Sequence, residues 1–232
     1  NGTFGESSAV SPSHTYTTNG TYNARLRVTD GEGLTNTATI VISVGNTAPR
    51  ATISTPATTL RWRVGQSVAF SGSATDTEDG TLAASALRWS LIMNHCSTAT
   101  SCHEHFIQEF AGVRSGTFTA PDHEYPSYLT LRLSATDSGG LQHEVTRRLD
   151  PQTVDFSLRS NPSGLELTFG SQSLRTPATR TVIVGSRTTL SAPTPQPLGG
   201  STYRFASWSD GGAQTHTIVA PAANASYTAR FR

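Results

Sequence analysis

The segment YLTLRLSATDSGG, residues 128–140, decides the fold class. Within it, leucines alternate with polar residues, and the run ends in Asp, Ser and two glycines. Strict alternation is the pattern of a β-strand with one buried face, and clusters of Asp and Gly form turns. TYNARLRV, residues 21–28, alternates in the same way, and turn residues recur about every 8–12 positions, which favours β-sandwiches. We therefore predict an all-β protein.

The charge balance excludes two classes of partner. The 232-residue chain has 17 basic and 16 acidic residues, and every basic residue is arginine. A nucleic-acid binder would show a strongly basic, clustered surface, so we predict no nucleic-acid partner. No apolar run approaches the roughly 20 residues that span a bilayer, so we predict no membrane span. The first ten residues lack the basic start and apolar stretch of a secretion signal, and we expect a mature or internal piece of an exported protein.

Composition shifts divide the chain into three segments. The linker GNTAP, Gly45 to Pro49, interrupts the alternating pattern with Gly, Asn and Pro. We predict one domain over residues 1–48, a second over 49–151 and a third over 152–232. The second is long enough for the core of a seven-stranded sandwich. The first has too few strands to close one.

The first segment resembles a known module. SHTYTTNGTYNARLRVTDGEG, residues 13–33, is similar to the His-Thr-Tyr, Gly-x-Tyr and Val-x-Asp pattern of PKD domains, which are β-sandwiches of secreted bacterial proteins. The resemblance implies that residues 1–48 are the C-terminal part of a PKD-like sandwich. The predicted fold is thus a row of PKD-like and Ig-like β-sandwich modules with a small C-terminal β domain.

The second and third segments resemble the C-terminal accessory region of secreted actinobacterial PQQ-dependent sugar dehydrogenases of the glucose/sorbosone type. The matching stretches are SATDTEDGTL (73–82), SGTFTAPDHEYPSYLTLRLSATDSGGL (115–141) and YRFASWSDGGAQTHTI (203–218). In such proteins catalysis resides in a separate β-propeller. The resemblance implies a secreted, extracellular accessory region with an upstream catalytic domain in the same polypeptide.

Two acidic loops form a candidate calcium site. The turns ATDTEDG (74–80) and ATDSGG (135–140) follow strands that a sandwich returns to the same end, next to the entry linker. Carboxylates that converge repel one another unless a cation lies among them, and Ca²⁺ binds 6–8 oxygens from such groups. Plain turn chemistry of Asp and Gly is the alternative. The predicted ligands are Asp76, Glu78, Asp79, Asp137 and Asn46.

The two cysteines, Cys96 and Cys102, flank the short stretch STATS. Zinc sites normally use a second cysteine pair, which this sequence lacks. A disulfide that closes a loop between two strands is the simpler interpretation, and it suits an exported protein.

Histidines surround the cysteines. If the disulfide joins neighbouring strands, His95 and His103 lie opposite each other, and His103 and His105 share a face because side chains alternate. Three imidazoles could then bind Zn, Cu or Ni, with His123 as a further candidate in a loop of undetermined position. The alternative is a solvated hairpin with exposed polar residues, and the sequence favours this interpretation over a transition-metal site.

Three tryptophans are candidate sugar-stacking residues. Trp62 lies between Arg61 and Arg63, and we predict an exposed ring that could bind carbohydrate. Trp89 occupies the place of the core tryptophan of an Ig-like third strand. Trp208 stands where a strand meets a turn, and the family resemblance implies that it packs beneath that turn.

Catalytic motifs are missing from the sequence: it has no G-x-S-x-G, H-E-x-x-H or Walker motif. We therefore predict non-catalytic accessory modules that bind extracellular polysaccharide or attach an enzyme to a cell surface. Calcium-stiffened spacer or adhesion modules without a glycan ligand are the first alternative. A metalloprotein built on the histidine cluster is the second.

Overall fold

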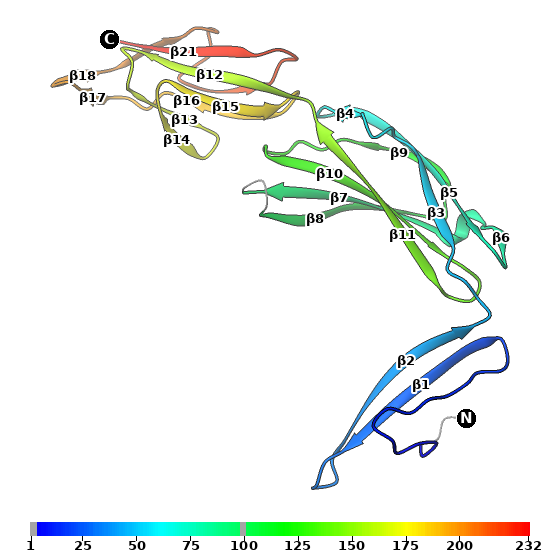
Figure 1. Ribbon diagram of the computed structural model, residues 1–232. Helices are drawn as coiled ribbons and strands as arrows, with labels where there is room; N and C mark the ends of the chain where they lie inside the picture. The colour runs from blue at the N-terminus through cyan, green and yellow to red at the C-terminus, as the bar shows by residue number, and fades with distance from the viewer. Residues whose placement is uncertain (1–3, 98–100) are drawn as a thin grey trace.

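The protein is described here by a computed structural model that covers residues 4–97 and 101–232. Antiparallel strands dominate these residues, and one short 3-10 turn, Ala84–Ala86, interrupts them. The sheets form three parts in chain order (Figure 1). The predicted all-β fold is confirmed.

The first part, which we call the first hairpin, consists of β1 (Gly20–Thr29) and β2 (Thr35–Val44). The strands pair antiparallel from Gly20 opposite Val44 to Thr29 opposite Thr35. Alternating apolar residues, which favour a strand, here remain largely in solvent: Leu26 is 62% exposed and Ile40 is 64% exposed. Two strands alone do not bury an apolar face.

The second part, the middle sandwich, has two facing sheets. One sheet contains, in spatial order, β4 (Arg61–Trp62), β11 (Gln142–Pro151), β10 (Ser127–Thr136), β7 (Leu87–Cys96) and β8 (Cys102–Ala111). The other contains β3 (Arg50–Thr55), β5 (Ser67–Asp76) and β6 (Gly80–Thr81), with β9 (Ser115–Thr119) paired to β5. Both sheets contribute to one hydrophobic core.

Alternation along the strands builds this core. In β10, Leu129, Leu131 and Leu133 are fully buried, while the residues between them are partly exposed. The facing sheet approaches closely at Gly72 of β5, where a Cβ atom would lie 2.9 Å from the Trp89 ring. A larger residue at this position would therefore push the two sheets apart.

The third part, the terminal unit, has two four-stranded sheets, a short hairpin and a core of its own. The first sheet runs β15 (Ala178–Ile183), β12 (Thr153–Asn161), β21 (Ala225–Phe231) and β19 (Phe205–Trp208). The second runs β14 (Gln172–Arg175), β13 (Glu166–Phe169), β16 (Arg187–Ser191) and β20 (Thr215–Val219). The hairpin pairs β17 (Gln196–Leu198) with β18 (Ser201–Tyr203).

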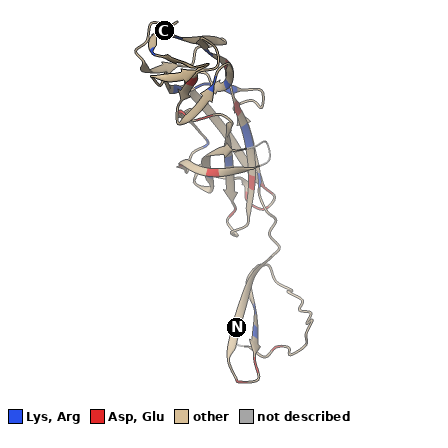
Figure 2. Ribbon diagram, turned by 90° about the vertical axis from the view of Figure 1, so that its left-hand side faces the viewer, with Lys and Arg blue, Asp and Glu red and all other residues tan. Residues whose placement is uncertain are grey.

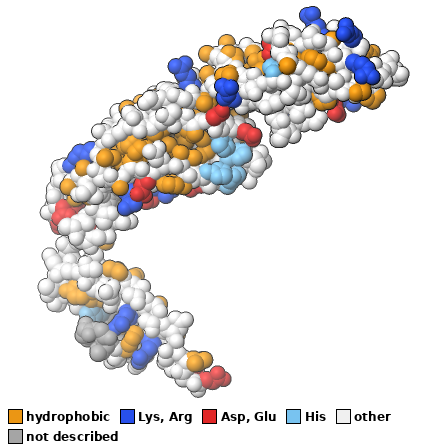
Figure 3. All heavy atoms as spheres, turned by 180° about the vertical axis from the view of Figure 1, so that it is seen from behind, with side chains coloured by type: hydrophobic (Ala, Val, Ile, Leu, Met, Phe, Trp, Pro, Cys, Tyr) orange, Lys and Arg blue, Asp and Glu red, His pale blue; other side chains and the backbone are white. Residues whose placement is uncertain are grey.

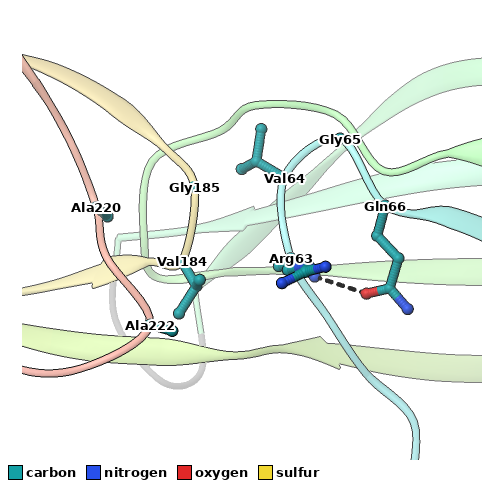
Figure 4. A pocket seen from close by; sticks show the side chains of 8 residues that line it. All are labelled: Arg63, Val64, Gly65, Gln66, Val184, Gly185, Ala220 and Ala222. Atoms are coloured by element: carbon teal, nitrogen blue, oxygen red, sulfur yellow. Dashed lines mark hydrogen bonds between the residues drawn. The ribbon is translucent and has the colours of Figure 1, made fainter.

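Backbone hydrogen bonds tie the terminal unit to the middle sandwich. Gln152, the one residue between β11 and β12, donates its N–H to the Trp62 carbonyl and accepts a hydrogen bond from the Val184 N–H. The Val64 N–H donates in turn to the Val184 carbonyl at 3.0 Å. Figure 4 shows the segment that contains Val64 beside the segment that contains Val184. Ile183 of β15, fully buried, belongs to the core of the middle sandwich.

Charged residues are sparse and mixed in sign along the chain (Figure 2). Among the described residues, no helix has the length and hydropathy needed to cross a membrane.

Candidate functional site

The structure brings the two acidic loops and the linker together at one end of the middle sandwich. The side-chain amide of Asn46 donates to Asp137 Oδ2 at 2.9 Å. The Thr47 hydroxyl donates to Glu78 Oε2 at 2.8 Å. Asp79 accepts hydrogen bonds from the backbone N–H and the hydroxyl of Ser138 at 2.7 and 2.8 Å. The loops thus meet as the topology predicts.

Most of these carboxylate oxygens already hold donors. Asp137 Oδ1 accepts from the Leu141 N–H, and Asp76 Oδ1 accepts from two N–H groups of its own loop. The hydrogen bonds from Ser138, the backbone one first, hold the pKa of Asp79 below its ordinary value. By contrast, Asp76 Oδ2 is buried with no hydrogen-bond partner among the described residues. A cation would satisfy this oxygen. Calcium binding at this site remains a prediction.

The predicted exposure of Trp62 is wrong. The ring is 0% exposed, and its Nε1–H donates to the Leu149 carbonyl at 2.9 Å. The cause is the parallel pairing of β4 with the end of β11. Alternation then directs Arg61 and Arg63 to solvent and Trp62 into the core. A ring in this position offers no face to a sugar.

The other two tryptophans lie where the sequence placed them. Trp89 is 0% exposed in the core of the middle sandwich, and its Nε1–H donates to the Val113 carbonyl. Trp208 is 4% exposed and donates to the Gln214 carbonyl beyond the turn that follows it. Both rings are structural.

The disulfide between Cys96 and Cys102 is present, as predicted. It joins directly opposed residues at the end of the β7–β8 pair, and His95 faces His103 in the next position of the register. His105 faces Met93, which is fully buried. The three histidines therefore continue the inner, core-facing row of side chains beyond the end of the core.

A fourth histidine, His123, joins this row from the loop between β9 and β10. Its ring centroid lies 4.9 Å from that of His95 and 6.2 Å from that of His105. Nitrogen atoms of His95, His105 and His123 all lie within 4.8 Å of one another. The sequence predicted His103 as the third member of the set; the structure instead selects His123. Figure 3 shows a patch of histidines on the middle sandwich, near its border with the terminal unit.

Comparisons with known proteins gave one family match. A family model described as "PKD domain" matches residues 2–44, in agreement with the resemblance of residues 13–33. The match covers the first hairpin and the segment before it. A search of curated proteins gave no match.

Two solved structures resemble the chain over most of its length. One is "Protocadherin Gamma B2 extracellular cadherin domains 3-6", with 9% identity and a TM-score of 0.26 over 90% of this chain. The other is "Ca2+-stabilized adhesin helps an Antarctic bacterium reach out and bind ice", with 11% identity and a TM-score of 0.24 over 88% of it. The chain spans 56% and 57% of those two chains.

Proposed function

We propose that this chain is a rigid, non-catalytic spacer or adhesion segment of an extracellular protein, which holds the parts joined to it at a fixed distance and orientation. The observation that carries the proposal is the junction between the middle sandwich and the terminal unit. There, a buried side chain and a set of backbone hydrogen bonds cross from one part to the other.

The junction leaves little room for hinge motion. One residue, Gln152, separates the last strand of the sandwich from the first strand of the terminal unit. Both of its backbone polar groups are hydrogen-bonded, to residues of β4 and of the loop after β15. At Gly185 a Cβ atom would lie 3.2 Å from Val64, so the two segments are in close contact. A bend here would break backbone hydrogen bonds of the buried residues Trp62 and Val184, and a buried polar group left unpaired costs about 1–3 kcal/mol.

An extracellular setting is supported by the disulfide, because such bonds persist in oxidising compartments. The PKD match of residues 2–44 supports a modular architecture. Attachment to a sugar dehydrogenase rests on the sequence resemblance alone. Carbohydrate binding has lost its aromatic candidate, since Trp62 is buried. A glycan array probed with the folded protein tests carbohydrate binding. Saturable binding to one polysaccharide class would support carbohydrate binding again.

The distance between two spin labels tests rigidity directly. The native cysteines form a disulfide, so introduced cysteines can be labelled selectively. Thr77→Cys and Ala223→Cys, both at exposed positions, report on the sandwich and the terminal unit. A reference pair, Thr77→Cys with Ser115→Cys, lies within the sandwich. We expect the first pair to give a distance distribution as narrow as the reference. A broad or multimodal distribution would contradict the proposal.

A further inference from the structure

We propose that His95, His105 and His123 form a site for one Zn²⁺ ion, or for a similar imidazole-binding transition metal, that joins the β7–β8 hairpin to the loop between β9 and β10. The sequence favoured solvated histidines; the tertiary structure adds a residue from a distant loop and reverses that preference. The metal site does not depend on the proposed spacer function.

The first support is the spacing of the nitrogen atoms. Three imidazole nitrogens lie within 4.8 Å of one another. Zinc–nitrogen bonds of 2.0–2.1 Å in a tetrahedral site correspond to nitrogen–nitrogen distances of about 3.4 Å. Rotation of the side chains, of which His105 is exposed and His95 and His123 half-buried, closes this difference. Three nitrogen ligands with an open fourth position are an ordinary zinc ligand set.

The second support is the tautomer of His123. Its Nδ1 lies 3.0 Å from the Glu124 carbonyl oxygen. A carbonyl accepts but never donates, so Nδ1 carries the proton in this hydrogen bond and Nε2 presents its lone pair. Metal-binding histidines commonly hold their second nitrogen in this way, because the bond fixes the ring orientation and makes the ligand nitrogen more basic.

A buried hydroxyl points to a polar ligand beside the histidines. Ser127 lies opposite His95 in the β7–β10 pair, so the two side chains share a face. Ser127 is 3% exposed, and its Oγ has no hydrogen-bond partner among the described residues. Buried hydroxyls are normally satisfied. A water molecule on the open coordination position of the metal is a chemically suitable partner.

The loop that carries His123 also contacts the terminal unit. The neighbouring residue, Asp122, accepts a hydrogen bond at Oδ2 from the backbone N–H of Arg187. Residues Asp122 to Tyr125 line a cleft of about 260 Å³ whose other wall is the terminal unit. An ion that fixes His123 to the hairpin would thereby also hold this side of the junction.

Zinc binding to untagged, chelator-treated protein tests the site. We expect calorimetry to show saturable binding of one Zn²⁺ per chain. Free Zn²⁺ at one hundred times the dissociation constant stabilises the folded state by about 2.7 kcal/mol. If the middle sandwich and the terminal unit unfold together, the midpoint of thermal unfolding should rise by about 5–10 °C.

Variants connect this binding to the proposed ligands. His105→Gln and His123→Gln should each weaken Zn²⁺ binding at least about 100-fold, since even loss of an outer partner of a ligand costs 10–100-fold. His14→Gln, far along the chain in the segment before β1, is the matched control and should bind as the unchanged protein does. Melting in EDTA confirms that each variant folds: all should have nearly the same midpoint there.

Two results would overturn the site. One is the absence of saturable binding at millimolar Zn²⁺. The other is a Zn²⁺-induced rise in melting temperature that persists in His123→Gln, because the ion would then bind elsewhere. Protection of the amides of residues 120–126 from hydrogen exchange, found only with Zn²⁺, would support the link between loop and hairpin.

Discussion

Ile183 provides the sharpest test of the junction. It belongs to β15 of the terminal unit, yet it is fully buried in the core of the middle sandwich. Ile183→Ala removes three buried carbon atoms, which costs about 2.4 kcal/mol at roughly 0.8 kcal/mol for each. The cavity left behind adds to this loss, so about 2–5 kcal/mol is the expected destabilisation.

Hydrogen exchange followed by mass spectrometry measures this cost separately in each part. In Ile183→Ala we expect faster exchange both in β10 of the sandwich and in β21 of the terminal unit. A loss of 2.4 kcal/mol corresponds to about 50-fold faster exchange for amides that open by unfolding. The physical reason is that one side chain contributes to the stability of two parts of the chain.

Ile218→Ala is the matched control. This isoleucine is 6% exposed and lies in the terminal unit's own core. We expect it to accelerate exchange in β21 and to leave β10 close to its original rate. If Ile183→Ala also leaves β10 unchanged, the reasoning about a shared core is refuted, and the rigid-spacer proposal loses its main support.

Three further outcomes are expected. Trp62→Phe should cost about 1–3 kcal/mol in urea unfolding, because the Leu149 carbonyl loses its buried donor; an unchanged midpoint would show that the carbonyl finds another. Ca²⁺ added to EDTA-treated protein should raise the melting temperature, and Asp76→Asn should remove this rise, because the ion would satisfy the unpartnered Oδ2; equal melts with and without Ca²⁺ would leave plain turn chemistry as the explanation. Burial lowers the pKa of His95, so the folded state favours the neutral ring. The neutral ring therefore contributes stability above pH 6.5, the pKa of the unfolded state, and this contribution is lost as the pH falls below that value. Melting in EDTA from about pH 7.5 to about pH 5.5 should show this fall, and His95→Gln should flatten it; an equally steep fall in the variant would assign the effect to other groups.

Some candidate sites depend on residues that are close in sequence or on the order of strands, and others depend on contacts between distant segments. The acidic loops follow strands that end at the same pole, so simple topology predicts that Asp79 and Asp137 lie near each other; both are held there by hydrogen bonds to neighbouring loops. The disulfide needed only a short loop between two strands. These predictions rest on neighbours in sequence or on the order of strands in a sandwich.

Alternation of apolar and polar residues, with turns between, determined by itself that the chain forms sheets, because a strand with one buried face has a period of two. The flanking arginines suggested that Trp62 is exposed, and this prediction is wrong because the burial of the ring depends on parallel pairing with a strand almost ninety positions later. The positions of His123 and Ile183 also depend on contacts between distant segments. The loop that carries His123 meets the β7–β8 hairpin, and Ile183 of the terminal unit enters the core of the middle sandwich. Contacts between distant segments come from tertiary packing. The periodicity of one strand shows which of its faces is buried, but it does not indicate which surface that face packs against.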